Sequence, residues 1–413
     1  MLGASAPAPA AGDVRQSHPP RCRTEDGRLR RRARRIRGNR SLPPSPPRAS
    51  HPRQALPAAS AAVCAASEAD LFHLLVDNFN EGTYPLRRID TSSLFFPRAE
   101  EVVPRKVEDA RLPHPLVSFA PLGDSCVSGN LAFFTTFGCG NKKSLIAGAD
   151  EKGFTFMYDL DQRVVHNQVH LNEPKQHDPV SLAVGDALYV MDRSPRPQNR
   201  RGFEALVYGH EQPGSLVGTQ SWRWHCLPPP PYVLAPGYKP SSISAYTVVG
   251  GSRIWISTPD IGTYSFDTST GTWDKAGKWV LPFHGRADYF PEYNLWLGFS
   301  SESRLLCSSD LSTASVQVKP ALHGILEDKQ VEEGWVLNES QLVYLGLGKF
   351  CVAKFFETEH YEVSRQGYVP QNESFAVLTG FVMDLTGPGG QLRMIRHKSR
   401  RYRFQAMTTG WVF

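Results

Sequence analysis

The sequence lacks long hydrophobic runs and contains few cysteines. No stretch approaches the roughly 18 consecutive apolar residues that a membrane-spanning helix needs, and the N-terminus lacks the apolar core of a secretory signal. We therefore expect no membrane association and no entry into the secretory route. The seven cysteines form no CxxC pair and no Cys/His cluster at metal-ligand spacing. This pattern indicates reduced thiols, with Cys307 and Cys351 as small buried residues in strands.

The motifs of several enzyme classes are absent as well. The chain has no GxSxG, no HExxH and no phosphate-binding glycine loop, and its 13 histidines are dispersed. We therefore predict a protein that is not an enzyme and that uses no metal and no other cofactor. The alternative is a propeller enzyme whose site is assembled from loops far apart in the sequence.

Positive charge is concentrated at the N-terminus. Residues 1–70 contain 13 Arg, no Lys and five acidic residues, so they carry +8 and leave −2 for the rest of a chain whose net charge is +6. This segment is rich in Ala, Pro and Ser and poor in aromatic residues, so it cannot bury enough surface to offset its ordering entropy. The composition predicts a disordered leader over residues 1–68.

The arginines of the leader are most concentrated in "RLRRRARRIRGNR". Its central arginines are Arg30, Arg31, Arg32, Arg34 and Arg35. They fit a nuclear-import signal or a patch that binds nucleic acid without sequence preference. The alternatives are an organelle transit peptide and a solvated charge run without function. We expect a cytoplasmic or nuclear protein, and the transit peptide stays open.

From Leu71 onward, short apolar runs alternate with Gly, Pro, Asn, Asp and Ser. These are strand and turn signals, and helical periodicity is visible only in "SEADLFHLLVDNF" at the edge of the domain. So many short strands predict an all-β fold, either an array of barrels or a propeller. The domain is expected over residues 69–408.

The stretch from Val248 to Trp279 is a template that recurs. Its first half, "VGGSRIWIS", is a strand, a Gly-Gly turn and a strand, and similar pieces begin at Val127, Val184, Phe290 and Leu337. Its second half, "GTYSFDTSTGTW", also recurs, and "GTYPLRRIDTSSLFF" (82–96) is a copy without a first half. This recurrence predicts a propeller of six blades, with five or seven possible.

Strands from both ends of the domain are expected to close the ring. A blade completed by both chain ends has no open edge that could pair with another molecule. We expect residues 82–96 to share a sheet with strands from residues 375–404. The repeat aromatics Trp255, Tyr264 and Trp273 are expected to pack between strands and blades.

The Gly-Gly step, the Tyr of the next strand and the Trp after the turn resemble kelch repeats. Segments such as "NEPKQHDPVSLAVGDALYVMDRSP" and "WHCLPPPPYV" resemble a family of uncharacterised kelch-like propeller proteins expanded in grasses. The resemblance covers about residues 70–405 and implies a propeller without an assigned activity. Some relatives of the kelch fold are copper-radical oxidases or iron-dependent specifier proteins, but the Glu-xxx-Asp-xxx-His pattern of the latter is absent.

Two long loops are candidates for binding a protein partner, because loops on a rigid ring commonly carry recognition. "DRSPRPQNRRG" is basic and offers Arg196, Arg200 and Arg201 to an acidic partner. "LPPPPYVLAPGYKP" is stiff and offers Tyr232 and Tyr238. We therefore expect a monomeric protein-interaction module, although both loops could be tolerated insertions.

Overall fold

The computed structural model describes most of the chain from residue 71 onward. The described residues are 71–78, 81–96, 106–121, 130–138, 144–167, 170–176, 178–210, 220–325, 334–358, 361–364, 367–370, 373–384, 392–404 and 410–413. The predicted leader and its arginine cluster lie outside them. Residues Val63–Phe413 form one compact unit. No helix within the described ranges is long and apolar enough to cross a membrane.

Nearly all regular structure is β-strand, joined by two 3-10 turns, η1 (Ser92–Leu94) and η2 (Pro231–Leu234). The first four-stranded sheet has the order β27 (Gly410–Val412), β1 (Leu71–Val76), β2 (Tyr84–Asp90), β4 (Pro115–Phe119). The second has the order β5 (Leu131–Phe133), β6 (Leu145–Asp150), β7 (Thr155–Asp159), β8 (Val164–Asn167). The third has the order β12 (Gln220–Cys226), β11 (Phe203–His210), β10 (Ala187–Met191), β9 (Val180–Val184).

Two larger sheets and a hairpin complete the described strands. The eight-stranded sheet has the order β16 (Thr272–Gly277), β15 (Gly262–Asp267), β14 (Arg253–Thr258), β13 (Ala245–Val249), β17 (Phe283–Phe290), β18 (Leu295–Ser300), β19 (Leu306–Ser309), β20 (His323–Gly324). The five-stranded sheet has the order β21 (Trp335–Gly346), β22 (Lys349–Thr358), β25 (Ser374–Asp384), β26 (Arg393–Phe404), β3 (Val107–Ala110). The hairpin consists of β23 (Tyr361–Ser364) and β24 (Gly367–Pro370).

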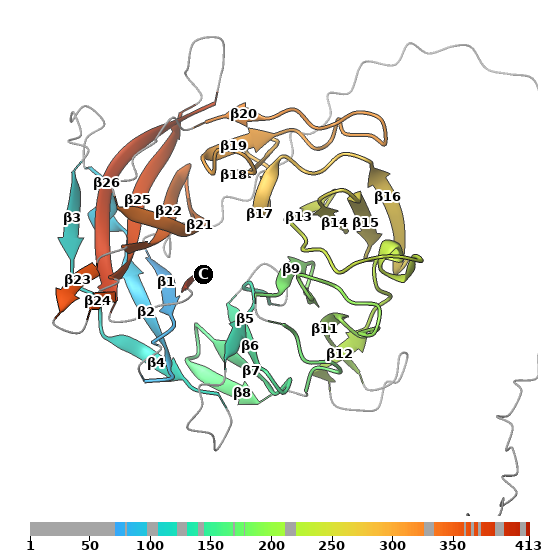
Figure 1. The fold of residues 1–413 in the computed structure, drawn as a ribbon, viewed down its shortest axis with the longest axis horizontal. Coiled ribbons are helices and arrows are strands. Elements are labelled where there is room, and N and C mark those ends of the chain that lie inside the picture. The colour runs from blue at the N-terminus through green and yellow to red at the C-terminus, as the bar shows by residue number, and fades with distance from the viewer. Residues whose placement is uncertain are drawn as a thin grey trace, which may run out of the picture. The chain divides into compact units, whose positions relative to one another are not determined.

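The sheets of this unit are arranged around a central axis in chain order (Figure 1). Strands β5, β9, β13, β17 and β21 lie nearest the centre, and β8, β12 and β16 lie at the outside. This is a β-propeller, so the predicted all-β propeller fold is confirmed. The eight-stranded sheet is continuous because β13 pairs in parallel with β17, Ala245 opposite Gly285. The count of six blades therefore stays a prediction.

The template stretch forms four consecutive antiparallel strands, β13 to β16. Gly250 and Gly251 make the first turn with φ of 62° and 72°, a conformation that glycine adopts without steric cost. At the turn between β15 and β16, the Oδ1 atom of Asp267 accepts hydrogen bonds from the amides of Ser269 (2.9 Å) and Thr270 (3.2 Å). Local turn chemistry thus fixes both hairpins.

Within the segment that shows helical periodicity, residues Leu71–Val76 form strand β1 and not a helix. Strand β1 pairs with β2 on one side and with β27 on the other. Phe72, Leu74, Leu75 and Val76 are all 2% exposed or less. Burial on both faces of a sheet favours a continuous apolar run, which periodicity alone does not distinguish from a buried helix.

The predicted partner of the first sheet is also wrong. Strand β25 pairs with β22 and with β26, and neither β25 nor β26 pairs with β2. The parallel strand β3 occupies the remaining edge of β26, with Val107 opposite Ser399. The first sheet instead gains β27, in which Trp411 lies opposite Leu75. This strand lies beyond residue 408, the expected end of the domain.

Candidate functional site

A cavity of about 950 Å³ lies among the inner strands of the propeller. Strands β13, β17 and β21 contribute to its wall, as do β27 and the segments that precede β9 and follow β5, β10 and β18. Leu342 and Val343 of β21 line it together with Trp411 and Phe413 at β27. Its volume falls within the range of small-molecule sites, roughly 300–1,000 Å³.

One part of the cavity wall is charged. The Nε atom of Arg193 lies 2.7 Å from Oδ2 of Asp178, and its guanidinium stands 5.6 Å from the ring centre of Tyr246. The Nη2 atom of Arg286 lies 2.7 Å from Oδ1 of Asp288. Arg286 also donates a hydrogen bond through Nη1 to the hydroxyl of Thr135, in the segment after β5. Two of the cavity's guanidiniums are therefore neutralised by carboxylates.

Glu339 of β21 carries a third carboxyl into this layer. Burial, assisted by the negative charge of Asp178, raises the pKa of Glu339 to about 7. The Nε2 atom of Gln341 donates to Oε1 of Glu339 (2.7 Å) and to the carbonyl of Gly410 (2.9 Å). The side chain of Glu339 is nevertheless accessible from the cavity. Solvent screening therefore reduces the effect of burial on its pKa.

Arg304 and His284 stand together at the same cavity. Arg304 lies in the turn between β18 and β19 with φ of 56°, and it is exposed. Burial and the positive charges of Arg304 and Arg193 lower the pKa of His284. Within the described ranges, Arg304 forms no ion pair. It is thus a cation without a paired carboxylate at the cavity.

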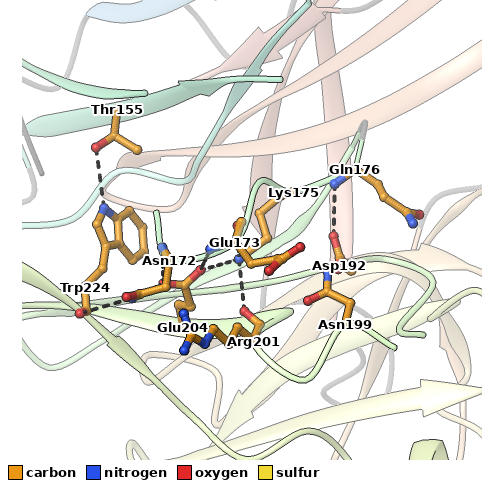
Figure 2. A network of polar contacts seen from close by, with 10 residues as sticks. All are labelled: Thr155, Asn172, Glu173, Lys175, Gln176, Asp192, Asn199, Arg201, Glu204 and Trp224. Atoms are coloured by element: carbon orange, nitrogen blue, oxygen red, sulfur yellow. Dashed lines mark hydrogen bonds and ion pairs between the residues drawn. The ribbon is translucent and has the colours of Figure 1, made fainter. Parts of the chain in front are cut away.

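A buried polar network holds the neighbouring segment 170–176 against β11 (Figure 2). The Nζ atom of Lys175 lies 2.5 Å from Oε1 of Glu204, and their side chains are 1% and 0% exposed. Nζ also donates to the carbonyls of Glu173 (2.6 Å) and Arg201 (3.3 Å). The other oxygen of Glu204, Oε2, accepts from the amide and the side chain of Asn172 (2.9 and 2.6 Å). Hydrogen bonds thus compensate the desolvation of both charges.

The same network extends to Asp192 at the start of the basic loop. Its Oδ1 accepts from the amide of Gln176 (2.9 Å) and its Oδ2 from the side chain of Asn199 (2.7 Å). Burial raises the pKa of Asp192. A Cβ atom at Gly202 would stand 2.8 Å from Oδ2 of Asp192, so the loop closes only with glycine there. Loop 192–202 is therefore fixed at both ends.

The predicted partner-binding arginines lie on this loop. Arg196, Arg200 and Arg201 are exposed, and none of them forms an ion pair with another described residue. The structure thus places them together on one loop at the surface, next to Arg193 of the cavity. Their role in binding stays a prediction.

The predicted tyrosines are positioned differently. Tyr232 is 7% exposed, and its hydroxyl lies 3.2 Å from Oγ1 of Thr258. Tyr238 is half-buried and donates its hydroxyl hydrogen to the carbonyl of Pro195 (3.0 Å). Their rings pack against each other at 5.6 Å. Both side chains attach the proline-rich loop to the propeller, and Tyr232 presents little surface to a partner.

The charged layer of the cavity was missed by sequence reasoning. Asp178 precedes β9, Arg286 lies on β17 and Glu339 on β21, so the ring brings these three residues together only in three dimensions. The sequence signal for this layer was the pair of charged residues Arg286 and Asp288 within the strand "FHGRADYF". No group of three or more His, Cys, Asp and Glu side chains in the described part of the chain could hold a metal ion.

Comparison with known families gives one match. The sequence profile of a family described as "Protein of unknown function (DUF1668)" matches residues 70–402. No curated protein matches the chain.

Several solved structures match the chain at low identity. The β-propeller domain of Cps50 (Swd1) from Myceliophteria thermophila is 12% identical, with a TM-score of 0.36 over 79% of this chain and 83% of that one. A protein from Lactobacillus plantarum is 12% identical, with a TM-score of 0.38 over 81% of this chain and 100% of that one. The dihydro-heme d1 dehydrogenase NirN is 10% identical, with a TM-score of 0.34 over 84% of this chain and 76% of that one.

Proposed function

We propose, for a chain that belongs to the DUF1668 family of proteins of unknown function, that the propeller is a non-enzymatic binding module. Its partner is a protein with an acidic segment, which docks on loop 192–202. The single observation that carries this proposal is a basic loop that is held rigid while Arg196, Arg200 and Arg201 remain exposed and form no ion pair within the described structure.

Rigidity of the loop lowers the entropy that docking would cost. Besides the Asp192 bonds, the hydroxyls of Ser194 and Ser242 lie 2.7 Å apart, and Tyr238 binds the carbonyl of Pro195. The amide of Asn199 donates to the carbonyl of Arg196 (3.1 Å). Contacts to two neighbouring segments therefore hold the loop in one conformation before any partner arrives.

The chemistry of the loop favours a carboxylate partner. Guanidinium groups bind carboxylates in a bidentate geometry, and Arg196, Arg200 and Arg201 offer three of them on one short loop. Because these groups are exposed, we expect them to act mainly on the association rate, with a strong dependence on ionic strength.

An acidic peptide tests the proposal directly. Binding of a glutamate-rich peptide is compared with that of its glutamine counterpart, using wild type and the triple variant Arg196→Gln/Arg200→Gln/Arg201→Gln. The control variant Lys106→Gln/Arg111→Gln/Lys319→Gln removes the same charge from exposed positions elsewhere. We expect salt-sensitive binding that is lost only in the first variant. Equal binding by both variants would refute the docking site.

We further propose that the module acts as a monomer in the cytoplasm or nucleus. Light scattering of the purified chain tests the first part, with a mass near 45.9 kDa expected. Metal analysis of the same sample tests the non-enzymatic role, since stoichiometric copper or iron would favour the enzyme alternative.

A further inference from the structure

Three arginines line the cavity, and two of them are paired with carboxylates. Arg193 is paired with Asp178 and Arg286 with Asp288, whereas Arg304 forms no ion pair with any described residue. Arg304 is exposed, but it lines a concave site whose low-dielectric walls focus its field and so strengthen its attraction for an anion compared with a flat surface. The guanidinium of Arg304, which has no carboxylate partner among the described residues, therefore points to an anionic ligand.

The remainder of the wall is suited to an organic molecule. Leu342, Val343, Trp411 and Phe413 line the cavity along β21 and β27. The Oγ atom of Ser340 is buried at the same wall and has no hydrogen-bond partner in the described structure. Small-molecule sites typically combine such apolar walls with a few polar groups that orient the ligand.

We propose that the axial cavity binds a small organic anion, whose carboxylate or phosphate group is held by Arg304 beside His284, and whose apolar part lies along β21 and β27. The lowered pKa of His284 favours its neutral imidazole, which offers a ring N–H donor. Of loop 192–202, only Arg193 lines this cavity, and Arg196, Arg200 and Arg201 do not, so the inference does not depend on the proposed protein partner.

Glu339 makes the affinity depend on pH. The charged and titratable groups around it are Asp178, Arg193 and Tyr246 across the cavity, and the uncharged amide of Gln341 on its own strand donates a hydrogen bond to it. As the pH rises through about 7, Glu339 ionises and the cavity gains a negative charge. Anion affinity should therefore be higher at about pH 6 than at about pH 8.

The probes are phenylacetate, phenyl phosphate and the uncharged phenylacetamide, measured by calorimetry and thermal shift. We expect at least one anion to bind and the amide to bind at least tenfold more weakly. The variant Arg304→Gln should weaken anion binding by about ten- to a hundredfold, the value of one lost charge-assisted hydrogen-bond pair. Arg and Gln both carry a Cβ atom, so the substitution adds no backbone strain at this positive φ.

Two further variants complete the test. Arg253→Gln removes an exposed arginine of β14 that does not line the cavity, and it should bind like wild type. Glu339→Gln should remove the change in affinity between about pH 6 and pH 8. The site is overturned if neither anion binds, if the amide binds as tightly, or if Arg304→Gln binds unchanged. A preference between phosphate and carboxylate identifies the group that the ligand carries.

Discussion

The Nζ atom of Lys175 lies 2.5 Å from Oε1 of Glu204, and neither side chain has more than 1% of its surface exposed. Every donor of this ammonium has an acceptor, since it also binds the carbonyls of Glu173 and Arg201. The pair holds segment 170–176, which leads into Asp178 at the cavity. Loss of this ion pair should therefore affect both the stability of the propeller and the position of Asp178 at the cavity.

Replacing one partner of this pair should destabilise the fold strongly. Lys175→Met leaves the Glu204 carboxylate buried without its cation, which typically costs about 3–5 kcal/mol. The double variant Lys175→Met/Glu204→Leu removes both charges and should recover much of that loss. Urea unfolding of the three proteins measures the differences. A Lys175→Met protein as stable as wild type would show that the pair is not needed.

Sequence patterns predicted local structure well and predicted contacts across the ring poorly. The hairpins of β13–β16 follow from Gly250, Gly251 and Asp267, whose turn preferences act within a few residues. Strand β27 is only three residues long, too short to display an alternating pattern. The cavity charges likewise come from separate sheets, so their proximity depends on how the ring closes.

Trp273 should contribute to packing between β11 and β15. Its ring stands 5.7 Å from that of Phe203 and 5.1 Å from that of Phe266, and its Nε1 donates to the carbonyl of Pro228 (2.8 Å). A fully buried Trp→Ala change costs about 3–5 kcal/mol, and this half-buried ring should cost about 2–3 kcal/mol. Thermal and urea unfolding of Trp273→Ala and of the milder Trp273→Phe provide the comparison. Unchanged stability with lost partner binding would instead make Trp273 a contact residue.

Removing residues 405–413 should open the ring. Without β27, strand β1 loses a paired edge, and Gln341 loses its bonds to Gly410 and Val412. Exposed strand edges pair with other molecules, so we expect aggregation and a lower melting temperature, measured by light scattering and calorimetry. The full-length variant Trp411→Ala is the control, since it keeps the strand but loses the ring packed 5.1 Å from Phe133. A monodisperse truncated protein that melts cooperatively would contradict closure by β27.

A fluorescent fusion of residues 1–70 should reveal what the leader does. If the arginine cluster is an import signal, the fusion accumulates in the nucleus, and changing Arg30, Arg31, Arg32, Arg34 and Arg35 to Gln abolishes this. Import into an organelle with cleavage would identify a transit peptide. A diffuse signal from both fusions would contradict any targeting role. Microscopy and the size of the fusion on a gel distinguish these results.

His73 should make the propeller sensitive to acid. It lies on β1, where its backbone amide and carbonyl pair with those of Phe413. Burial, together with the positive charges of Arg88 and Arg163, lowers the pKa of His73 to about 4. The unfolded chain therefore binds this proton more tightly than the folded one, and stability falls as the pH drops from about 6.5 to about 4, by up to about 3 kcal/mol. Urea midpoints at about pH 7 and pH 4.5 measure the loss, which should be smaller in His73→Gln. The exposed His166→Gln is the control and should lose as much as wild type. An equal acid loss in His73→Gln and wild type would show that His73 is not the group responsible.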